Sequence, residues 1–304
     1  MHSIDPKLLK ALSAVVQQGG FKKASDVLNI SQSAVSHRIK LLEDQIGQIL
    51  LTRTSPPAPT PSGQQMIKHY QQVQMLENNL FKILEHKSEE RFTTFVIGLN
   101  ADSLATWFLA AVESFLKEER LLLDVLVDDQ EHTLELLNEG KVSGCISANP
   151  EPVQGCSVEY LGAIHYHLLC SPEFRDRWFP SGITLQSVSR APMLVYSRKD
   201  RSHERLIESV LGEVPKHLTA HYIPIVEDQF IRFVSSGTAC GMCDLTANPK
   251  CLSFFKEGKL VDLAPGHSSR TELYWHSWNL KTDVMNKFSK LLVRRVRELL
   301  GSPS

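Results

Sequence analysis

Near the N-terminus, amide, hydroxyl and basic side chains are spaced so that they share one face of a short helix. After Ser31, the apolar residues Ala34, Val35, Ile39 and Leu42 recur at helical spacing, and the polar residues fall largely on the opposite face. Such polar groups match the hydrogen-bonding edges of bases and the charge of phosphates. The residues that we expect to contact DNA are Ser31, Gln32, Ser33, Ser36, His37, Arg38, Lys40 and Arg53.

The neighbouring sequence predicts the elements that would present this face. Residues 6–18 are amphipathic and end at a Gly-Gly pair, residues 21–30 form a second helix, and Ser31 stands where an N-cap belongs. Residues 49–53 suggest a short strand and the proline-rich residues 54–59 its loop, which together would make a wing. The pattern predicts a winged helix-turn-helix, although any solvated amphipathic helix pair shows the same periodicity.

The charge distribution favours the DNA-binding interpretation. Residues 1–60 hold seven Lys and Arg against four Asp and Glu, a formal charge of +3, whereas the whole chain carries −1. A basic head on an acidic body suits a DNA-binding unit joined to a regulatory one.

A long helix should connect these two units. It begins at Thr60-Pro61, a cap followed by an N1 proline, and extends to about residue 85. Its apolar residues repeat every three or four positions: Met66, Tyr70, Val73, Leu76, Leu80 and Ile83. Such a narrow stripe is typical of a helix buried against a partner helix, so we expect a dimerising connector; packing within its own domain is the alternative.

Residues 92–304 alternate between strand and helix patterns. We expect strands at 95–99, 121–127, 142–146, 164–170, 193–196, 222–226 and 272–278, and helices at 102–116, 134–139, 204–211, 229–236 and 284–300. This alternation predicts an α/β body with parallel sheets and helices on both faces, in one large or two small lobes.

Other function classes find little support. Cys240 and Cys243 form a CxxC pair, but no second pair or His pair accompanies it, so buried thiols are favoured over a metal site. No nucleophile elbow, Walker loop or dinucleotide motif is present, and we expect no enzyme and no cofactor. No apolar segment would span or cross a membrane, so we expect a cytoplasmic protein.

In order and motif, the chain resembles the LysR-type transcriptional regulators. The motifs carrying this resemblance lie at residues 24–36, 39–43 and 50–53, and those at 99–107, 260–266 and 273–276 resemble the ArgP (IciA) branch. The resemblance implies a winged helix-turn-helix domain (1–60), a linker and dimerisation helix (61–90) and a two-lobed, periplasmic-binding-protein-like effector domain (91–304). The first lobe would comprise about 92–165 and 267–304, and the second about 166–266.

The ArgP branch responds to lysine and arginine, which implies a basic amino acid as effector in the cleft between the lobes. The carboxylate of such an effector would need amides and hydroxyls at the start of a helix, and its cationic groups would need carboxylates from the protein. The expected effector-binding residues are Asn100, Asp102, Ser103, Thr106, Asp129 and Asp228. Plain helix capping is the alternative role for Asp102 and Ser103. Ile225 and Glu227 depart from the branch pattern, so the effector preference can differ.

The resemblance further implies binding to double-stranded DNA as a homodimer or homotetramer, contact with RNA polymerase, and activation of genes such as a basic-amino-acid exporter. The alternative function is an architectural or replication-inhibiting DNA-binding protein without ligand-controlled transcription.

Overall fold

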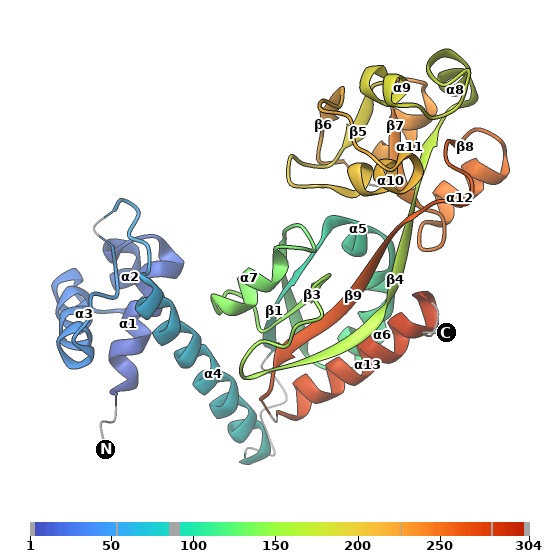
Figure 1. Cartoon of the computed structure of the whole chain (residues 1–304). Helices are drawn as coiled ribbons and strands as arrows, with labels where there is room; N and C mark the ends of the chain where they lie inside the picture. The colour runs from blue at the N-terminus through green and yellow to red at the C-terminus, as the bar shows by residue number, and fades with distance from the viewer. Residues whose placement is uncertain (1–3, 53, 85–91, 226, 281, 301–304) are drawn as a thin grey trace.

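The computed structural model describes residues 4–52, 54–84, 92–225, 227–280 and 282–300. A small helical head is followed by a long helix and then by an α/β body of two lobes (Figure 1). None of the described helices combines the length and hydrophobicity that crossing a bilayer requires.

Three helices build the head: α1 (Pro6–Gln18), α2 (Phe21–Leu28) and α3 (Gln32–Ile46). Gly19 ends α1 with a φ of 69°, a left-handed conformation that glycine adopts without a steric penalty. Leu12, Val15, Val35 and Leu42 are fully buried between the helices. The helix bounds and the turn between α2 and α3 therefore confirm the predicted helix-turn-helix.

The wing is less regular than predicted. The Thr52 amide donates to the Ala58 carbonyl (2.8 Å) and the Thr60 amide to the Leu50 carbonyl (2.9 Å), which closes a hairpin. Among the described residues of the hairpin, only Leu51 and Pro59 form a β-bridge, so the strand predicted at 49–53 is wrong as a regular element. Three prolines in this hairpin lack the amide hydrogens that a longer ladder needs.

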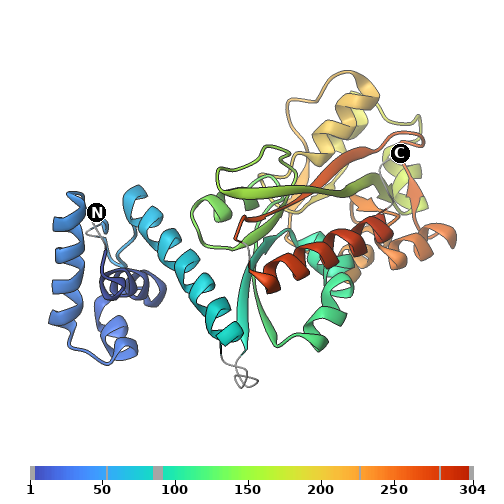
Figure 2. The ribbon, with the colours of Figure 1, turned by 90° about the horizontal axis from the view of Figure 1, so that it is seen from below.

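Helix α4 (Pro61–Leu84) confirms the predicted long helix, and Figure 2 shows it between the head and the body. Ile67 is buried in the core of the head, and Met66 and Tyr70 pack against the same core. Farther along, Leu76 and Leu80 are exposed in the single chain. The first half of the helix therefore packs against the head, and its second half exposes an apolar edge to solvent.

The first lobe is built on a short sheet with helices packed against it. Its strands are β1 (Thr93–Leu99), β2 (Leu121–Val127) and β3 (Gly144–Ser147). A continuous helical segment, comprising α5 (Ala101–Ser103), the π-helical turn η1 (Leu104–Phe108) and α6 (Leu109–Glu118), follows β1. Helix α7 (Thr133–Asn138) follows β2, and α13 (Asp283–Leu300) closes the lobe, where Phe288 makes edge contacts with Phe95 and Phe115.

The second lobe repeats this plan with shorter strands: β5 (Met193–Val195), β6 (Ala220–Tyr222), β7 (Cys240–Asp244) and β8 (Val261–Asp262). Its helices are α8 (Pro172–Trp178), α9 (Leu185–Arg190), α10 (Ser202–Leu211), α11 (Glu227–Ser235) and α12 (Pro249–Lys256). Of these elements, α8, α9, β7, α12 and β8 were not predicted, because their apolar runs are too short to show a period.

Two long strands connect the lobes: β4 (Cys156–Cys170) and β9 (Ser269–Trp278). They pair antiparallel from Cys156 to Tyr166, and β4 then pairs with β7 of the second lobe from Tyr166 onward. The described strands form one nine-stranded mixed sheet, in the order β2-β1-β3-β9-β4-β7-β5-β6 with β8 on β4. The expected parallel pairing is confirmed within each lobe, between β1, β2 and β3 and between β5, β6 and β7. Pairings with β4 and β9 are antiparallel, because a strand that returns the chain from one lobe to the other must run against its partner.

We propose that domain boundaries lie at 60/61 and 90/91, and that the chain passes from the first lobe to the second near residue 165 and returns near residue 267. The separate apolar cores of the head and of the two lobes support it. The boundary at 90/91 itself lies outside the described residues.

The junction between wing and linker provides a stability test. Gly63 lies in the first turn of α4 against the backbone of Leu50, so an added Cβ would overlap the Leu50 carbonyl oxygen. We expect Gly63→Ala to lower the free energy of unfolding of the head by about 1–3 kcal/mol, measured by far-ultraviolet circular dichroism in denaturant, despite the better helix propensity of alanine. Gly20→Ala, which meets open space, is the matched control. Equal stability of the two variants would contradict this packing.

Candidate functional site

Helix α3 presents the polar face that the sequence predicted. The Ser31 hydroxyl accepts a hydrogen bond from the Ala34 amide (3.1 Å), which confirms the N-cap. Val35, Ile39 and Leu42 turn inward. Six of the predicted contact residues are exposed on the other face: Ser31, Gln32, Ser33, Ser36, His37 and Lys40. Arg38 is half-buried.

A groove separates this face from the wing. Gln32, Ser36 and Lys40 line it from α3, and Thr52 and Thr54 line it from the hairpin. The Glu43 carboxylate accepts the amide of Leu50 (2.8 Å) and so fixes the start of the wing to the end of α3. Arg53, the predicted wing contact, lies outside the described residues. The geometry suits a helix placed in a major groove beside a wing that meets the backbone.

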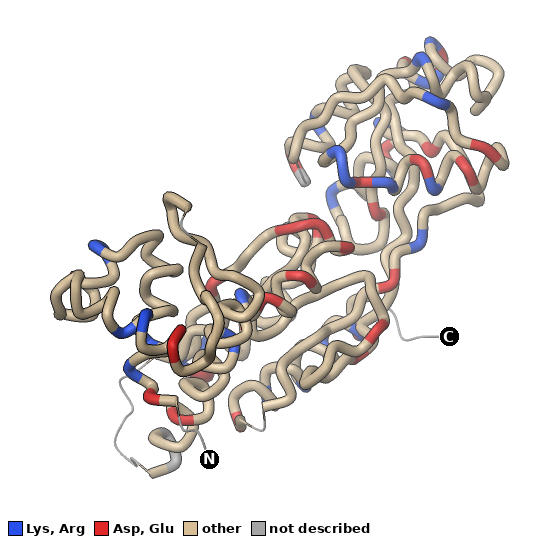
Figure 3. Tube along the Cα trace, turned by 60° about the vertical axis from the view of Figure 1, so that its left-hand side comes forward, with Lys and Arg blue, Asp and Glu red and all other residues tan. Residues whose placement is uncertain are grey.

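The second site is a small cavity of about 60 Å³ between the lobes. Four carboxylate residues border it: Asp102, Asp128 and Asp129 from the first lobe and Asp200 from the second. Figure 3 shows acidic stretches of the first lobe opposite a stretch of the second lobe with alternating basic and acidic residues. The described residues that line the cavity include neither Lys nor Arg, so its walls favour a cation.

Burial perturbs these carboxyl groups. Removal from water raises the pKa of Asp102 from its ordinary value of 3.8 to about 6, against the hydrogen bond that its Oδ2 accepts from the Tyr166 hydroxyl (3.2 Å). The negative charges of Asp200, Asp244 and Asp129 raise the Asp102 pKa further. Burial likewise raises the pKa of Asp129, although its Oδ1 accepts the Glu131 amide (2.9 Å). Carboxylates held this way would be stabilised by a bound cation.

Two further side chains in the cavity wall have unused hydrogen-bonding capacity. The Asn100 Oδ1 and both ring nitrogens of His203 are buried and have no hydrogen-bond partner within the described residues. Burial lowers the pKa of His203, because removal from water disfavours the charged imidazolium. Because buried polar groups normally find partners, these atoms point to a ligand or to ordered water.

The structure brings together only some of the predicted effector residues. Asn100, Asp102 and Asp129 line the cavity. Ser103 is fully buried, and the Thr106 hydroxyl donates to the Asp102 carbonyl oxygen (2.7 Å) beside a smaller neighbouring cavity. Asp228 is exposed at the start of α11 and forms an ion pair with Lys250 outside the cavity.

Sequence reasoning did not select several lining residues from the second lobe. Tyr196 directly follows β5, Asp200 lies in the loop after it, and His203 lies in the first turn of α10. A carboxylate in a loop gives no periodic signal, so only its position opposite Asp102 and Asp129 identifies it.

The CxxC pair lies within β7, where Cys240 and Cys243 are buried and unoxidised. Burial raises the pKa of the Cys240 thiol. Among the described residues, no group of three or more His, Cys, Asp and Glu side chains is arranged to hold a metal ion. These thiols contribute to packing in the second lobe.

A winged helix-turn-helix followed by a connector helix and a two-lobed body with a polar cleft defines a ligand-responsive class of DNA-binding regulator. The family described as "Bacterial regulatory helix-turn-helix protein, lysR family" matches residues 6–64. The HTH-type transcriptional regulator ArgP of Pseudomonas aeruginosa is 40% identical over 299 residues, which cover 97% of each chain. The chain belongs to the LysR family of bacterial transcriptional regulators, whose members are not enzymes.

Two solved structures extend the similarity to the whole fold. The crystal structure of ArgP from Mycobacterium tuberculosis has a TM-score of 0.86 at 31% identity and covers 98% of this chain and 99% of that chain. The full-length regulator LysG from Corynebacterium glutamicum, with bound effector Arg, has a TM-score of 0.77 at 27% identity and covers 97% and 99%.

The recognition face can be tested by separating phosphate contacts from base contacts. We expect Arg38→Ala to weaken binding to all duplexes and to reduce the slope of log affinity against log salt by about 1.

We expect Gln32→Ala to reduce the binding free energy by about 1–3 kcal/mol on a duplex selected from a random pool and by little on a scrambled one. Titration by fluorescence anisotropy would measure both. Equal weakening by Gln32→Ala on both duplexes would show that Gln32 does not contact bases.

The raised pKa of Asp102 predicts a pH-dependent stability. Because its pKa is higher in the folded state, ionisation of Asp102 destabilises the fold, and this penalty develops as pH rises from about 4 to 6. We expect Asp102→Asn to raise the free energy of unfolding at pH 7.5 by about 1–3 kcal/mol and by less at pH 5, measured by denaturant titration without ligand. Asp176→Asn, an exposed control, should show no such gain. An equal gain in unfolding free energy at both pH values would show that ionisation of Asp102 is not its cause.

Proposed function

We propose that this protein is a LysR-type regulator whose transcriptional output is controlled by a basic amino acid, lysine or arginine, bound between the lobes. The observation that carries this proposal is the cavity bordered by Asp102, Asp128, Asp129 and Asp200. LysG, solved with bound effector Arg, supports the choice of ligand class, since it shares the fold at 27% identity.

The chemistry of the cavity suggests an orientation for the ligand. Asn100 and Ala101 lie at its wall where the helical segment 101–118 begins, and the positive end of a helix dipole favours a carboxylate there. Asp128, Asp129 and Asp200 would then receive the ammonium or guanidinium groups, because charge-assisted hydrogen bonds in a site with little water are the strong kind. Ser103, Thr106 and Asp228 remain predicted contributors outside this wall.

Binding would change the position of one lobe relative to the other. A volume of about 60 Å³ is well below the roughly 300 Å³ at the lower end of typical ligand sites, so access requires the lobes to separate. Closure around the ligand would rotate the lobes and, through α4, the head. An effector acts only through its different affinity for the two arrangements.

We further propose that the protein works as a homodimer, or a homotetramer, on an interrupted palindrome in double-stranded DNA. The exposed Leu76, Leu80 and Leu84 on α4 support a helix-to-helix contact with a second copy. Contact with RNA polymerase at genes such as a basic-amino-acid exporter completes the proposed role.

Calorimetry of the full chain tests the proposal. We expect lysine or arginine to bind and norleucine, which lacks the side-chain cation, not to bind. Asp129→Asn should weaken binding at least tenfold, since it removes one charge-assisted contact, whereas Asp176→Asn should leave it unchanged. Failure of both basic amino acids to bind would refute the effector assignment and would favour an architectural or replication-inhibiting DNA binder, whose DNA binding ignores ligand.

A further inference from the structure

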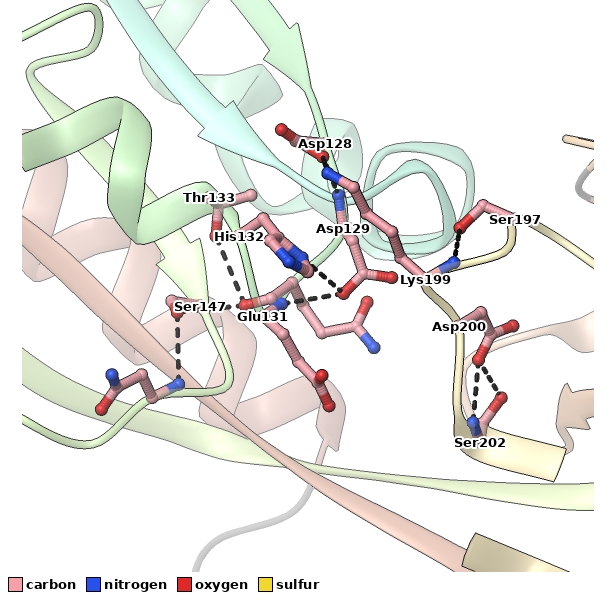
Figure 4. Close-up of polar contacts among 12 residues, drawn as sticks. Asp128, Asp129, Glu131, His132, Thr133, Ser147, Ser197, Lys199, Asp200 and Ser202 are labelled. Carbon is pink, nitrogen blue, oxygen red and sulfur yellow. Dashed lines mark hydrogen bonds and ion pairs between the residues drawn. The ribbon is translucent and has the colours of Figure 1, made fainter. Parts of the chain in front are cut away.

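Two ion pairs cross the cleft between the lobes at the mouth of the acidic cavity. Lys199 Nζ of the second lobe lies 3.9 Å from Asp128 Oδ1 of the first, and Arg205 Nη1 lies 2.6 Å from Glu131 Oε1. Figure 4 shows the Lys199 side chain extending from its loop to Asp128, while Asp200 of the same loop turns to Ser202. A primary ammonium group of the protein itself therefore already contacts one of the four carboxylates.

We propose that Lys199 is a tethered competitor of the ligand: its ammonium group pairs with Asp128 at the border of the cavity, and the cationic group of a ligand that contacts Asp128 must displace it. This inference rests on the proposed function of the cleft and concerns how its affinity is set. Lys199 would thus be a residue that tunes the ligand concentration to which the regulator responds.

The contact has the properties of one that can be displaced. At 3.9 Å it is at the outer limit of an ion pair, and the Lys199 side chain is 58% exposed. Exposed pairs of this kind are worth little, because water solvates the ammonium equally well when it leaves. The same Asp128 oxygen also accepts the Asp129 amide (2.8 Å), so Asp128 keeps a partner when Lys199 moves away.

The loop that carries Lys199 is held independently of the side chain. The Lys199 amide donates to the Ser197 hydroxyl (3.2 Å), and Asp200 Oδ1 accepts the Ser202 amide (2.9 Å). Displacement of the ammonium therefore requires rotation of a flexible side chain and leaves the loop in place. Asp200, which also borders the cavity, would stay available to the ligand.

The neighbouring arginine provides a matched control. The Arg198 guanidinium lies over the Tyr222 ring, 4.4 Å from its centroid, and makes no described contact with the four carboxylates. Removal of either cation changes the net charge by the same amount in the same loop. Any difference between the two variants therefore reports the local contact with Asp128 and not the general potential of the cleft.

Calorimetry of the full-length wild type, Lys199→Gln, Lys199→Arg and Arg198→Gln with lysine and with arginine tests the inference. We expect Lys199→Gln to bind about two- to fivefold more tightly than Arg198→Gln, the range expected for release from an exposed ion pair. Lys199→Arg keeps the cation and should bind like the wild type. Unchanged thermal midpoints would show that the substitutions act on binding and not on folding.

Four other outcomes are informative. Equal affinities of Lys199→Gln and Arg198→Gln would overturn the tethered competitor while the proposed function stands. Weaker binding by Lys199→Gln would also overturn it, because Lys199 would then bind the ligand carboxylate. Absence of binding by every variant would overturn the proposed function and this inference together, whereas binding by Lys199→Gln alone would support both.

Discussion

The antiparallel pairing of β4 with β9 is the constraint on which the regulatory body depends. These two strands connect the lobes, and β4 transfers its pairing from β9 to β7 at Tyr166, which registers with Ser269 and Asp244. The Tyr166 hydroxyl donates to Asp102 at the wall of the cavity. One residue thus belongs both to the strand that joins the lobes and to the site where a ligand would act on their separation.

The head depends on a different and more local set of contacts. The Ser31 cap begins the recognition helix, and the Glu43 carboxylate ties the end of that helix to the wing. Helix α4 then contributes Ile67 to the same core. Because linker, wing and recognition helix share one core, a rotation of α4 changes the direction of the recognition helix and need not disturb its fold.

Electrostatics explains why the cleft invites a cation. Burial raises the pKa of Asp102 to about 6, and the neighbouring charges of Asp200 and Asp129 add to this shift. Burial and the charge of Asp200 also raise the pKa of Asp129. Two ion pairs, Lys199 with Asp128 and Arg205 with Glu131, connect the lobes beside the cavity. The cleft therefore stores an unfavourable interaction between carboxylates that a positively charged ligand relieves.

The sequence by itself determined the head, the connector helix and the α/β class, because these depend on caps and periodic burial within ten to twenty neighbouring residues. Their positions after predicted strands, together with the family resemblance, also pointed to Asn100, Asp102 and Asp129, and the structure places all three in the cavity wall. Only the tertiary structure decided that Asp200 and His203 line the same cavity, that Lys199 pairs with Asp128, and that Asp228 lies outside. The reason is physical: a site between lobes is formed by strand pairing across 100 residues of chain, and no local pattern encodes which loops that pairing brings together.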